Sequence, residues 1–323
     1  MSKISLRRLD RHNERDRGQW EALLARSPNA TIFHSPAFLS YHGERFNEHH
    51  LGCFNGEQLF GLIPLALVER EGGIEARSPY GASFGGFVFA SEPDFSKSDQ
   101  VVAAIKEHLA GVGVRRAVVT PPLAAHGREP QDTFLFAMLH QGFRIANSDV
   151  TSIVSLRPEV EAEVFTSRAR NMARKAETAG ITCTMRAPLG DFWPLMEKTF
   201  DRLGVTPTHT EAQWQWLMER LPDSVWVDLA YLGDRPVAGI GRLKVNSLVD
   251  SSFYLCSDPK HQETQALTLL IARSIAASAK AGFRWFDFGT SSVDMVPREN
   301  LFRFKESFGA LGLFRHRLEA DLA

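Results

Sequence analysis

Local-structure signals recur in the same order in the two halves of this 323-residue chain. The paired positions are Ser35 and Thr210 at helix starts, Gly56 and Gly233 in hairpin turns, and Gly113 and Gly282 between a helix and a buried strand. These pairs are separated by 175, 177 and 169 residues. Near-equal offsets in the same order predict two copies of one helix–hairpin–helix–strand unit, although any two α/β domains share some of these signals. The expected fold class is α/β (α+β), with a mixed central sheet in each half.

Capping residues, turns and hydrophobic runs set the expected element ranges. Helices are expected over 14–26, from 36, over 101–109 and 133–140, from 211, and over 262–281, with strands over 51–54, 59–68, 115–120 and 143–156. The pair Arg157-Pro158 is the expected boundary, which gives an N-terminal domain of residues 1–157 and a C-terminal domain of residues 158–323. No Gly/Ser linker separates the two halves, so they are expected to pack closely.

Composition excludes several classes of protein. The net charge is −1, which does not favour nucleic acid or an anionic membrane as a partner. The three cysteines form no C-x-x-C pair, which argues against a disulfide framework and a cysteine zinc site. The charged N-terminus lacks a signal-peptide core, and no run approaches the roughly 18 apolar residues of a membrane span. The expected location is the cytoplasm.

Residues 282–310 carry the strongest catalytic candidates. Asp287 interrupts the apolar run formed with Phe286 and Phe288, and a buried carboxylate is costly unless it is paired. A polar GTSS loop follows at the end of this strand, where ligands of α/β sheets usually bind. Lys305 stands on a short helix beyond the loop. The alternative is structural: Asp287 caps the loop and Lys305 is solvated.

A basic helix is expected within residues 159–179. Four cations fall in eight residues with no acid among them: Arg168, Arg170, Arg174 and Lys175. Such a cluster can hold a phosphate or a carboxylate. A solvated basic face explains it equally well.

Two further segments are candidates for binding or catalysis. In SPYGASFGGFVF, residues 78–89, glycines inside a β-like run mark either a bulge or a close approach of ligand to backbone. His209, in the segment PTHT, could act as a base near neutral pH, although loop histidines are often only solvated. His34, His42, His49 and His50 lack metal-ligand spacing, so no metal is expected.

These motifs together resemble the Fem-like and BioF2-like acyltransferases, which are tandem GNAT-type enzymes of cell-envelope and polysaccharide pathways. The run FDFGTSSVD…NLFRFKESFGA resembles the closing motif of that family. SPYGASFGGFV, RNMARKAETAGI and PTHT…W…LPDSV fit the family in the same order. The likeness extends from about Trp20 to Gly309, and the closing motif is its most specific part.

The resemblance implies two GNAT-like domains and transfer of an acyl or aminoacyl group to an amine or hydroxyl. It implies that the acceptor is a small molecule or glycan precursor and that the C-terminal domain holds the donor. The implied catalytic residues are Asp287, Lys305 and His209. The implied substrate-binding residues are Tyr80, Ser83, Arg170, Asn171, Tyr254 and Ser291. The implied cofactor-binding residues are Gln262, Thr264 and Gln265, at a helix N-terminus that could bind the phosphates of acyl-CoA.

The chain departs from the family pattern in two places. The phosphate-binding stretch reads PKHQETQAL, with no glycine and with Glu263 where a phosphate would be repelled. No stretch is free to form the long helical arm of enzymes that use aminoacyl-tRNA. The first departure argues against acyl-CoA and the second against aminoacyl-tRNA, so both donors remain open, with acyl-CoA as the expected co-substrate. A non-catalytic binding protein that kept the fold is the third alternative.

Overall fold

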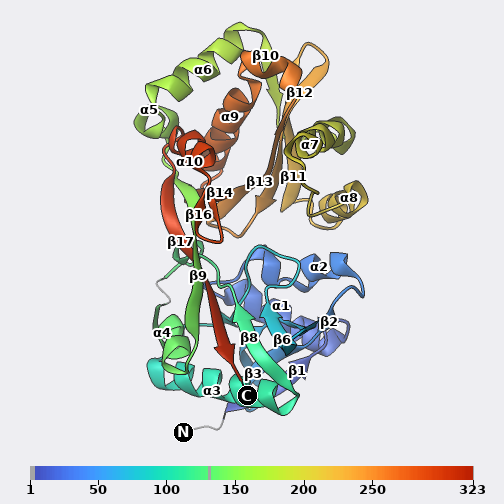
Figure 1. Ribbon diagram of the computed structural model, residues 1–323, viewed down its shortest axis with the longest axis vertical. Helices are drawn as coiled ribbons and strands as arrows, with labels where there is room; N and C mark the ends of the chain where they lie inside the picture. Colours follow the sequence, from blue (N-terminus) through green and yellow to red (C-terminus); the bar gives the residue numbers. More distant parts are fainter. Residues whose placement is uncertain (1–3, 130–131, 323) are drawn as a thin grey trace. The chain divides into compact units, whose positions relative to one another are not determined.

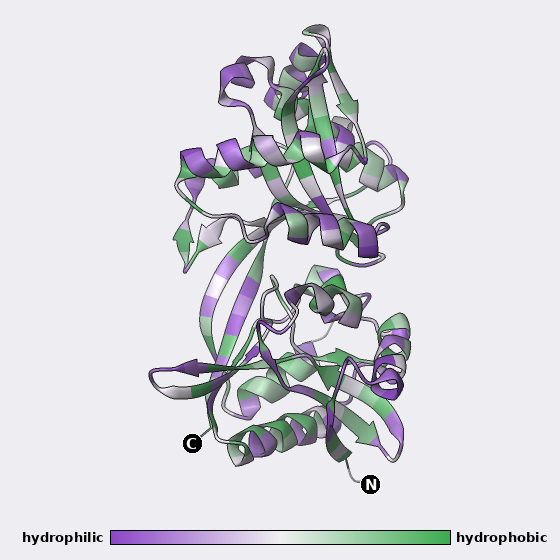
Figure 2. Cartoon of the chain, turned by 90° about the vertical axis from the view of Figure 1, so that its right-hand side faces the viewer, coloured by the Kyte–Doolittle hydropathy of each residue, from purple (hydrophilic) through white to green (hydrophobic). Residues whose placement is uncertain are grey.

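The computed structural model describes residues 4–129 and 132–322 (Figure 1). The chain forms two compact units, which are described separately below. Unit 1 comprises Met1–Asp149 with Phe314–Ala323, and unit 2 comprises Val150–Leu313. In both units hydrophobic residues dominate the central strands, whereas the helices also carry hydrophilic residues (Figure 2).

In unit 1 a first strand and a capped helix are followed by a series of hairpins. Its elements are β1 (Ile4–Leu9), α1 (Glu14–Arg26), α2 (Pro36–Leu39), β2 (Asn47–Glu48), β3 (His50–Asn55), β4 (Gln58–Ile63), β5 (Ala66–Arg70), β6 (Gly73–Ser78), β7 (Val88–Phe89), α3 (Phe95–Gly111), β8 (Val114–Val119) and α4 (Asp132–His140). Short 3₁₀ turns, η1 (Ile32–His34), η2 (Ser40–His42) and η3 (Ala124–His126), complete it. The side chain of Asn13 caps α1, and that of Ser35 caps α2 with Pro36 at its first position.

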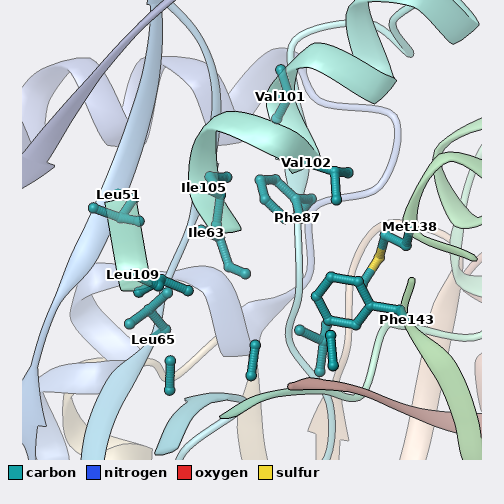
Figure 3. Close-up of a cluster of buried hydrophobic side chains, with 14 of the residues drawn as sticks. Leu51, Ile63, Leu65, Phe87, Val101, Val102, Ile105, Leu109, Met138 and Phe143 are labelled. Carbon is teal, nitrogen blue, oxygen red and sulfur yellow. The ribbon is translucent and has the colours of Figure 1, made fainter. Parts of the chain in front are cut away.

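Two sheets make up the β-structure of unit 1. One has the order β1-β3-β4-β7, and the other contains the run β17-β8-β6-β5-β2, where β17 is Leu311–Asp321. Strands β6 and β8 are parallel, and α3 makes the crossover between them, whereas their other neighbours are antiparallel. The core lies under α3, whose apolar face packs with residues of β3, β4 and α4 and with Phe143, which precedes β9 (Arg144–Ser155) (Figure 3). The core residues shown there are Leu51, Ile63, Leu65, Phe87, Val101, Val102, Ile105, Leu109, Met138 and Phe143.

Unit 2 repeats this plan with longer strands. Its elements are α5 (Val160–Val164), α6 (Ser167–Thr178), β10 (Ile181–Thr184), α7 (Leu189–Leu203), α8 (Glu211–Arg220), β11 (Val225–Leu232), β12 (Arg235–Lys244), β13 (Val249–Ser257), η4 (Pro259–Thr264), α9 (Ala266–Lys280), β14 (Trp285–Thr290), β15 (Ser292–Val293), β16 (Val296–Pro297) and α10 (Glu299–Glu306). The strand order is β10-β11-β12-β13-β14-β9. Helices α7 and α8 cover one face of this sheet and α9 covers the other (Figure 1).

The fold class predicted from the sequence is confirmed. Each unit contains a mixed sheet in which a helix joins two parallel strands, β6 with β8 in unit 1 and β13 with β14 in unit 2. Gly113 and Gly282 follow the two crossover helices, and Gly56 and Gly233 occupy the hairpin turns with positive φ. A left-handed backbone at the turns is the physical reason that glycine recurs at these positions.

The division into units differs from the predicted division at residue 157. Strand β9 (Arg144–Ser155) enters unit 2 and pairs there with β14, while β17 (Leu311–Asp321) returns to unit 1 and pairs with β8. The last strand of each half therefore completes the sheet of the other unit. Turn and capping signals in the sequence do not reveal such an exchange, because each strand follows directly on the other elements of its own half of the chain.

Three element ranges also need correction. The expected strand over 59–68 is two strands, β4 and β5, separated after Ile63. The basic segment over 159–179 contains two helices, α5 and α6, because Phe165 and Thr166 have extended backbone. The expected helix over 262–281 begins only at Ala266, since Gln265 has φ +59° and breaks the helix from the 3₁₀ turn before it.

A buried ion cluster lies between the unit 2 sheet and α9. Arg242 on β12 donates to Asp228 at 2.7 Å and also to Asp250 and, at 2.8 Å, to the Ser278 hydroxyl. Ser274 donates to Asp228 at 3.1 Å. These side chains are all buried, and burial raises the pKa of Asp250 above its ordinary value. One guanidinium thus holds two carboxylates inside the core.

Candidate active site

The carboxyl ends of the parallel strands β13 and β14 separate from each other. Their pairing runs through Val249↔Trp285 and Asp250↔Phe286 and stops at Ser251↔Asp287. Strand β13 nevertheless continues to Ser257, and β14 continues to Thr290 while paired with β9. Because α9 makes the crossover between these strands, its N-terminus lies at the same edge (Figure 1). Ligands of open α/β sheets bind at such carboxyl edges.

A β-bulge at Phe253 turns the following side chain of β13. Gly241 pairs with Tyr254 and Arg242 pairs with Ser252, so that Phe253 is the extra residue. The bulge directs Tyr254 toward Trp214 on α8 instead of toward α9. A Cβ at position 241 would lie 3.1 Å from the Cβ of Tyr254, so the close approach favours glycine there.

His209 and Tyr254 form a buried hydrogen-bonded pair. His209 precedes α8, whose start is fixed by a capping box between Thr210 and Gln213. The Nδ1 atom of His209 lies 2.8 Å from the Tyr254 hydroxyl, and the His209 backbone N–H donates to the same oxygen at 3.1 Å. Each residue is only 4% exposed. The sequence-based alternative of a solvated loop histidine is therefore wrong.

Asp287 and Lys305 organise the loop after β14. The Asp287 carboxylate accepts the Gly289 N–H at 2.6 Å, and the Lys305 ammonium donates to the carbonyls of Gly289 and Thr290 at 2.9 and 2.6 Å. Lys305, on α10, is 3% exposed and so is not solvated. Burial lowers the pKa of Lys305 to about 8, and the negative charge of Asp287 partly opposes that shift. Asp287 and Lys305 therefore both bond the backbone of Gly289, which has a left-handed conformation with φ +72°.

Ser291 continues this loop but is fully buried. Its hydroxyl lies 2.7 Å from the Ser152 hydroxyl on β9, and its N–H donates to the carbonyl of Val150 at 2.7 Å. Both contacts attach the loop to the neighbouring strand. Substrate contact by Ser291 remains a prediction from the family resemblance.

The predicted donor residues form the turn before α9. Gln262 is exposed, and its carbonyl accepts the N–H of Gln265 at 3.1 Å. The Thr264 hydroxyl donates to the carbonyl of His261 at 2.6 Å, and Gln265 accepts the Thr268 hydroxyl at 3.2 Å. The first N–H groups of α9 follow directly and point toward the carboxyl edge of β13 and β14. Glu263 is exposed beside them.

The other predicted binding residues lie on α6 and in unit 1. Arg170 donates to the Phe165 carbonyl and to the Ser167 hydroxyl, and Asn171 is exposed on the same helix, which packs against α9 and β10. Tyr80 and Ser83 follow β6 in unit 1, where the segment is a loop instead of the expected β-like run. There they line a cavity of about 810 Å³.

The structure therefore gathers most of the predicted residues of the second half at one edge of one sheet. It adds Trp214 and Phe253, which pack on the His209 ring with centroid distances of 5.2 and 5.4 Å. In unit 1 it adds the arginines of the 810 Å³ cavity, which sequence reasoning missed. The alternation of Arg315 and Arg317 on a late strand was the available signal, but it lies beyond the recognised motif.

Within the described residues, no group of three or more His, Cys, Asp or Glu side chains is arranged to hold a metal ion. None of the helices in residues 4–129 and 132–322 has the length and hydropathy needed to cross a membrane.

Comparisons with known proteins identify a domain family and similar folds. Residues 165–306 match the acetyltransferase (GNAT) domain family. The solved structure of FemX is similar over 98% of this chain and 97% of that one, with a TM-score of 0.71 and 12% identity. The C-terminal domain of a putative lysylphosphatidylglycerol synthetase from Agrobacterium fabrum is similar over 94% and 91%, with a TM-score of 0.63 and 11% identity. No curated protein matches the sequence significantly.

A third similar structure is a tandem GNAT protein from the clavulanic acid biosynthesis pathway, with a TM-score of 0.51 and 11% identity over 99% of both chains. At these identities the structural likeness shows the fold. The family match identifies residues 165–306 as a GNAT acetyltransferase domain, and the protein is an acyltransferase. Its resemblance to the Fem-like, tandem GNAT-type enzymes is confirmed.

Proposed function

We propose that the protein transfers an acyl group from acyl-CoA to an amine or hydroxyl of a cell-envelope or polysaccharide precursor. The observation that carries this proposal is the separation of β13 and β14 at the edge where α9 begins. A thioester donor would lie along the end of β13 that is not paired with β14, with its phosphates at the N-terminus of α9. The names of the FemX and lysylphosphatidylglycerol synthetase neighbours support envelope chemistry.

The residues at this edge fit the steps of acyl transfer. His209 would remove the proton of the attacking nucleophile, with the Tyr254 hydroxyl holding its ring in place. Tyr254 lies three residues beyond Ser251, the last residue of β13 that pairs with β14. Three residues correspond to about 10 Å along a strand. Lys305 and Asp287 would fix the loop that faces the developing oxyanion, so that they position the site or stabilise its charge.

Two observations favour acyl-CoA over aminoacyl-tRNA as donor. The described helices of unit 2 are at most 15 residues long, so none forms the long arm that the family resemblance associates with tRNA. The net charge of the chain is −1. A mass-spectrometric assay should detect acetyl transfer from acetyl-CoA to members of a panel of amino sugars and nucleotide sugars. Transfer only from aminoacyl-tRNA, or no transfer at all, would contradict the proposal. The cytoplasmic location remains a prediction.

Replacing His209 with Gln should lower kcat by roughly 10²–10⁴, because general-base catalysis contributes about that factor. Tyr254→Phe should lower kcat less than His209→Gln does, since it removes only the hydroxyl that orients the ring. His12→Gln, which changes an exposed histidine in unit 1, is the matched control. A kcat near the wild-type value in His209→Gln would assign the base to another residue.

Replacing Glu263 with Gln should tighten coenzyme A binding about two- to fivefold. The Glu263 carboxylate repels a phosphate bound at the helix N-terminus, and one charge at that position changes the binding free energy by about 0.3–1 kcal/mol. Isothermal titration calorimetry with coenzyme A gives the dissociation constant directly. Glu211→Gln, an exposed change in the first turn of α8, should leave it unchanged. Unchanged or weaker binding in Glu263→Gln would place the donor phosphates away from α9.

A further inference from the structure

An arginine-lined cavity in unit 1 occupies the edge that corresponds to the active-site edge of unit 2. Its lining includes Ser78, the last residue of β6, the residues 79–83 that follow it, and Thr120, which follows β8. These residues lie at the carboxyl ends of the parallel strands β6 and β8. The cavity measures about 810 Å³, a size typical of small-molecule sites. Its position follows the same rule for ligand sites in α/β sheets.

The lining of this cavity is strongly cationic. Glu69 supplies the single carboxylate among the lining residues. The five arginines that line the cavity are Arg45, Arg70, Arg77, Arg315 and Arg317. Two glutamates next to the lining are each shared among several arginines. Glu75 lies 3.0 Å from Arg77, 3.9 Å from Arg70 and 3.6 Å from Arg116. Glu319 likewise contacts Arg116, Arg144 and Arg317. Positive charge is therefore in excess here.

Strand register explains why the arginines gather on one face. Arg77 and Glu319 both lie beside Val118, on β6 and β17 respectively. Their neighbours Ala76 and Leu318 point into the core under α3, so the alternate residues face the opposite way. Arg317 and Arg315 continue the β17 row, and Arg315 donates to the carbonyl of Ser83 in the loop after β6. The guanidinium groups therefore converge from two strands on one loop.

The wall of the cavity is apolar and rigid beside these charges. The rings of Phe46 and Tyr80 pack edge to face with centroids 5.1 Å apart, and Arg45 stacks on Phe46 at 4.8 Å. The Tyr80 hydroxyl donates to Glu48 at 3.0 Å, which fixes that ring. Gly81 is required for this arrangement, because a Cβ there would lie 2.2 Å from the His42 ring. Such a wall suits an organic scaffold better than a bare inorganic ion.

We propose that this cavity binds an organic anion that carries at least two phosphoryl or carboxylate groups. Planar guanidinium groups recognise both kinds of oxyanion with paired hydrogen bonds. The ligand is the acceptor of acyl transfer, and this one assignment rests on the proposed function. Binding of the anion itself does not depend on it.

Calorimetry on the full chain at low ionic strength tests the site, with pyrophosphate and citrate as probes and no acyl donor present. At least one probe should bind, and Arg77→Gln and Arg315→Gln should each weaken it roughly ten- to hundredfold. Arg77→Gln leaves Glu75 in contact with Arg70 and Arg116, so the fold is retained. Arg144→Gln is the matched control, because Arg144 pairs with Glu319 and Asp321 but does not line the cavity.

Preference for pyrophosphate assigns a phosphorylated ligand, and preference for citrate assigns a polycarboxylate. The proposal is overturned if neither probe binds, or if the two cavity variants bind as tightly as the wild type. If the probe binds as expected and no acyl transfer is ever found, the anion site stands while the proposed function fails. If transfer is found, Arg77→Gln should raise the KM of the acceptor and leave kcat unchanged.

Discussion

Replacing Lys305 with Ala should lower kcat by roughly 10²–10³ while the KM for the acceptor changes much less. In the proposed mechanism the buried ammonium would stabilise charge that develops only in the transition state, and the loss of one such group has about that effect. It also holds the carbonyls of Gly289 and Thr290, so the loop beside Asp287 loses its geometry as well. Steady-state kinetics with a saturating donor separates the two parameters.

Lys280→Ala, which removes an exposed lysine at the end of α9, is the control and should keep both parameters. If KM rises and kcat is retained in Lys305→Ala, the lysine only anchors the acceptor. Wild-type values of both would remove Lys305 from the site. Lys305→Met keeps most of the side-chain volume and therefore separates the loss of charge from the loss of packing.

The same lysine should give a pH signature in stability. Its pKa is about 8 in the folded protein and 10.5 in its unperturbed state. Between these values the unfolded chain binds the proton and the folded chain does not, so the free energy of unfolding should rise as pH increases from 8 to 10.5. Urea unfolding at a series of pH values should show this rise in the wild type and not in Lys305→Met.

Replacing Arg242 with Leu should reduce the free energy of unfolding by about 3–5 kcal/mol, the usual effect of removing one partner from a buried ion pair. Asp228 and Asp250 would then remain buried together without their shared guanidinium. Denaturant unfolding, followed by a probe in unit 2 such as Trp214 fluorescence, measures the loss. A decrease of less than about 1 kcal/mol would show that water or proton uptake replaces the arginine.

Arg235→Leu provides the matched control, because Arg235 lies on the same strand and is exposed. Its effect should stay within about 0.5 kcal/mol. Replacing Arg242, Asp228 and Asp250 together with apolar residues should recover much of the stability lost in Arg242→Leu, since no buried charge is then left unpaired.

Local signals predicted the helices and hairpins well where they depend on a few neighbouring residues. The helix over residues 14–26 was placed to the residue, because Asn13 caps it and Ser27-Pro28-Asn29 ends it. The helix over 262–281 was placed four residues too early. Its start depends on the left-handed conformation of Gln265, which no residue preference signals.

Local patterns in the sequence are enough to predict the mixed α/β class, the repeated order of elements and the closing motif around Asp287 and Lys305. Those features depend on capping residues, turns and periodicity, which act over a few residues. Three other features follow only from the folded chain. Strands β9 and β17 complete the sheets of the opposite units, and a bulge at Phe253 turns Tyr254 onto His209. Arginines from β6 and β17 line one cavity. These arrangements depend on strand register between segments distant in the chain, which local preferences do not encode.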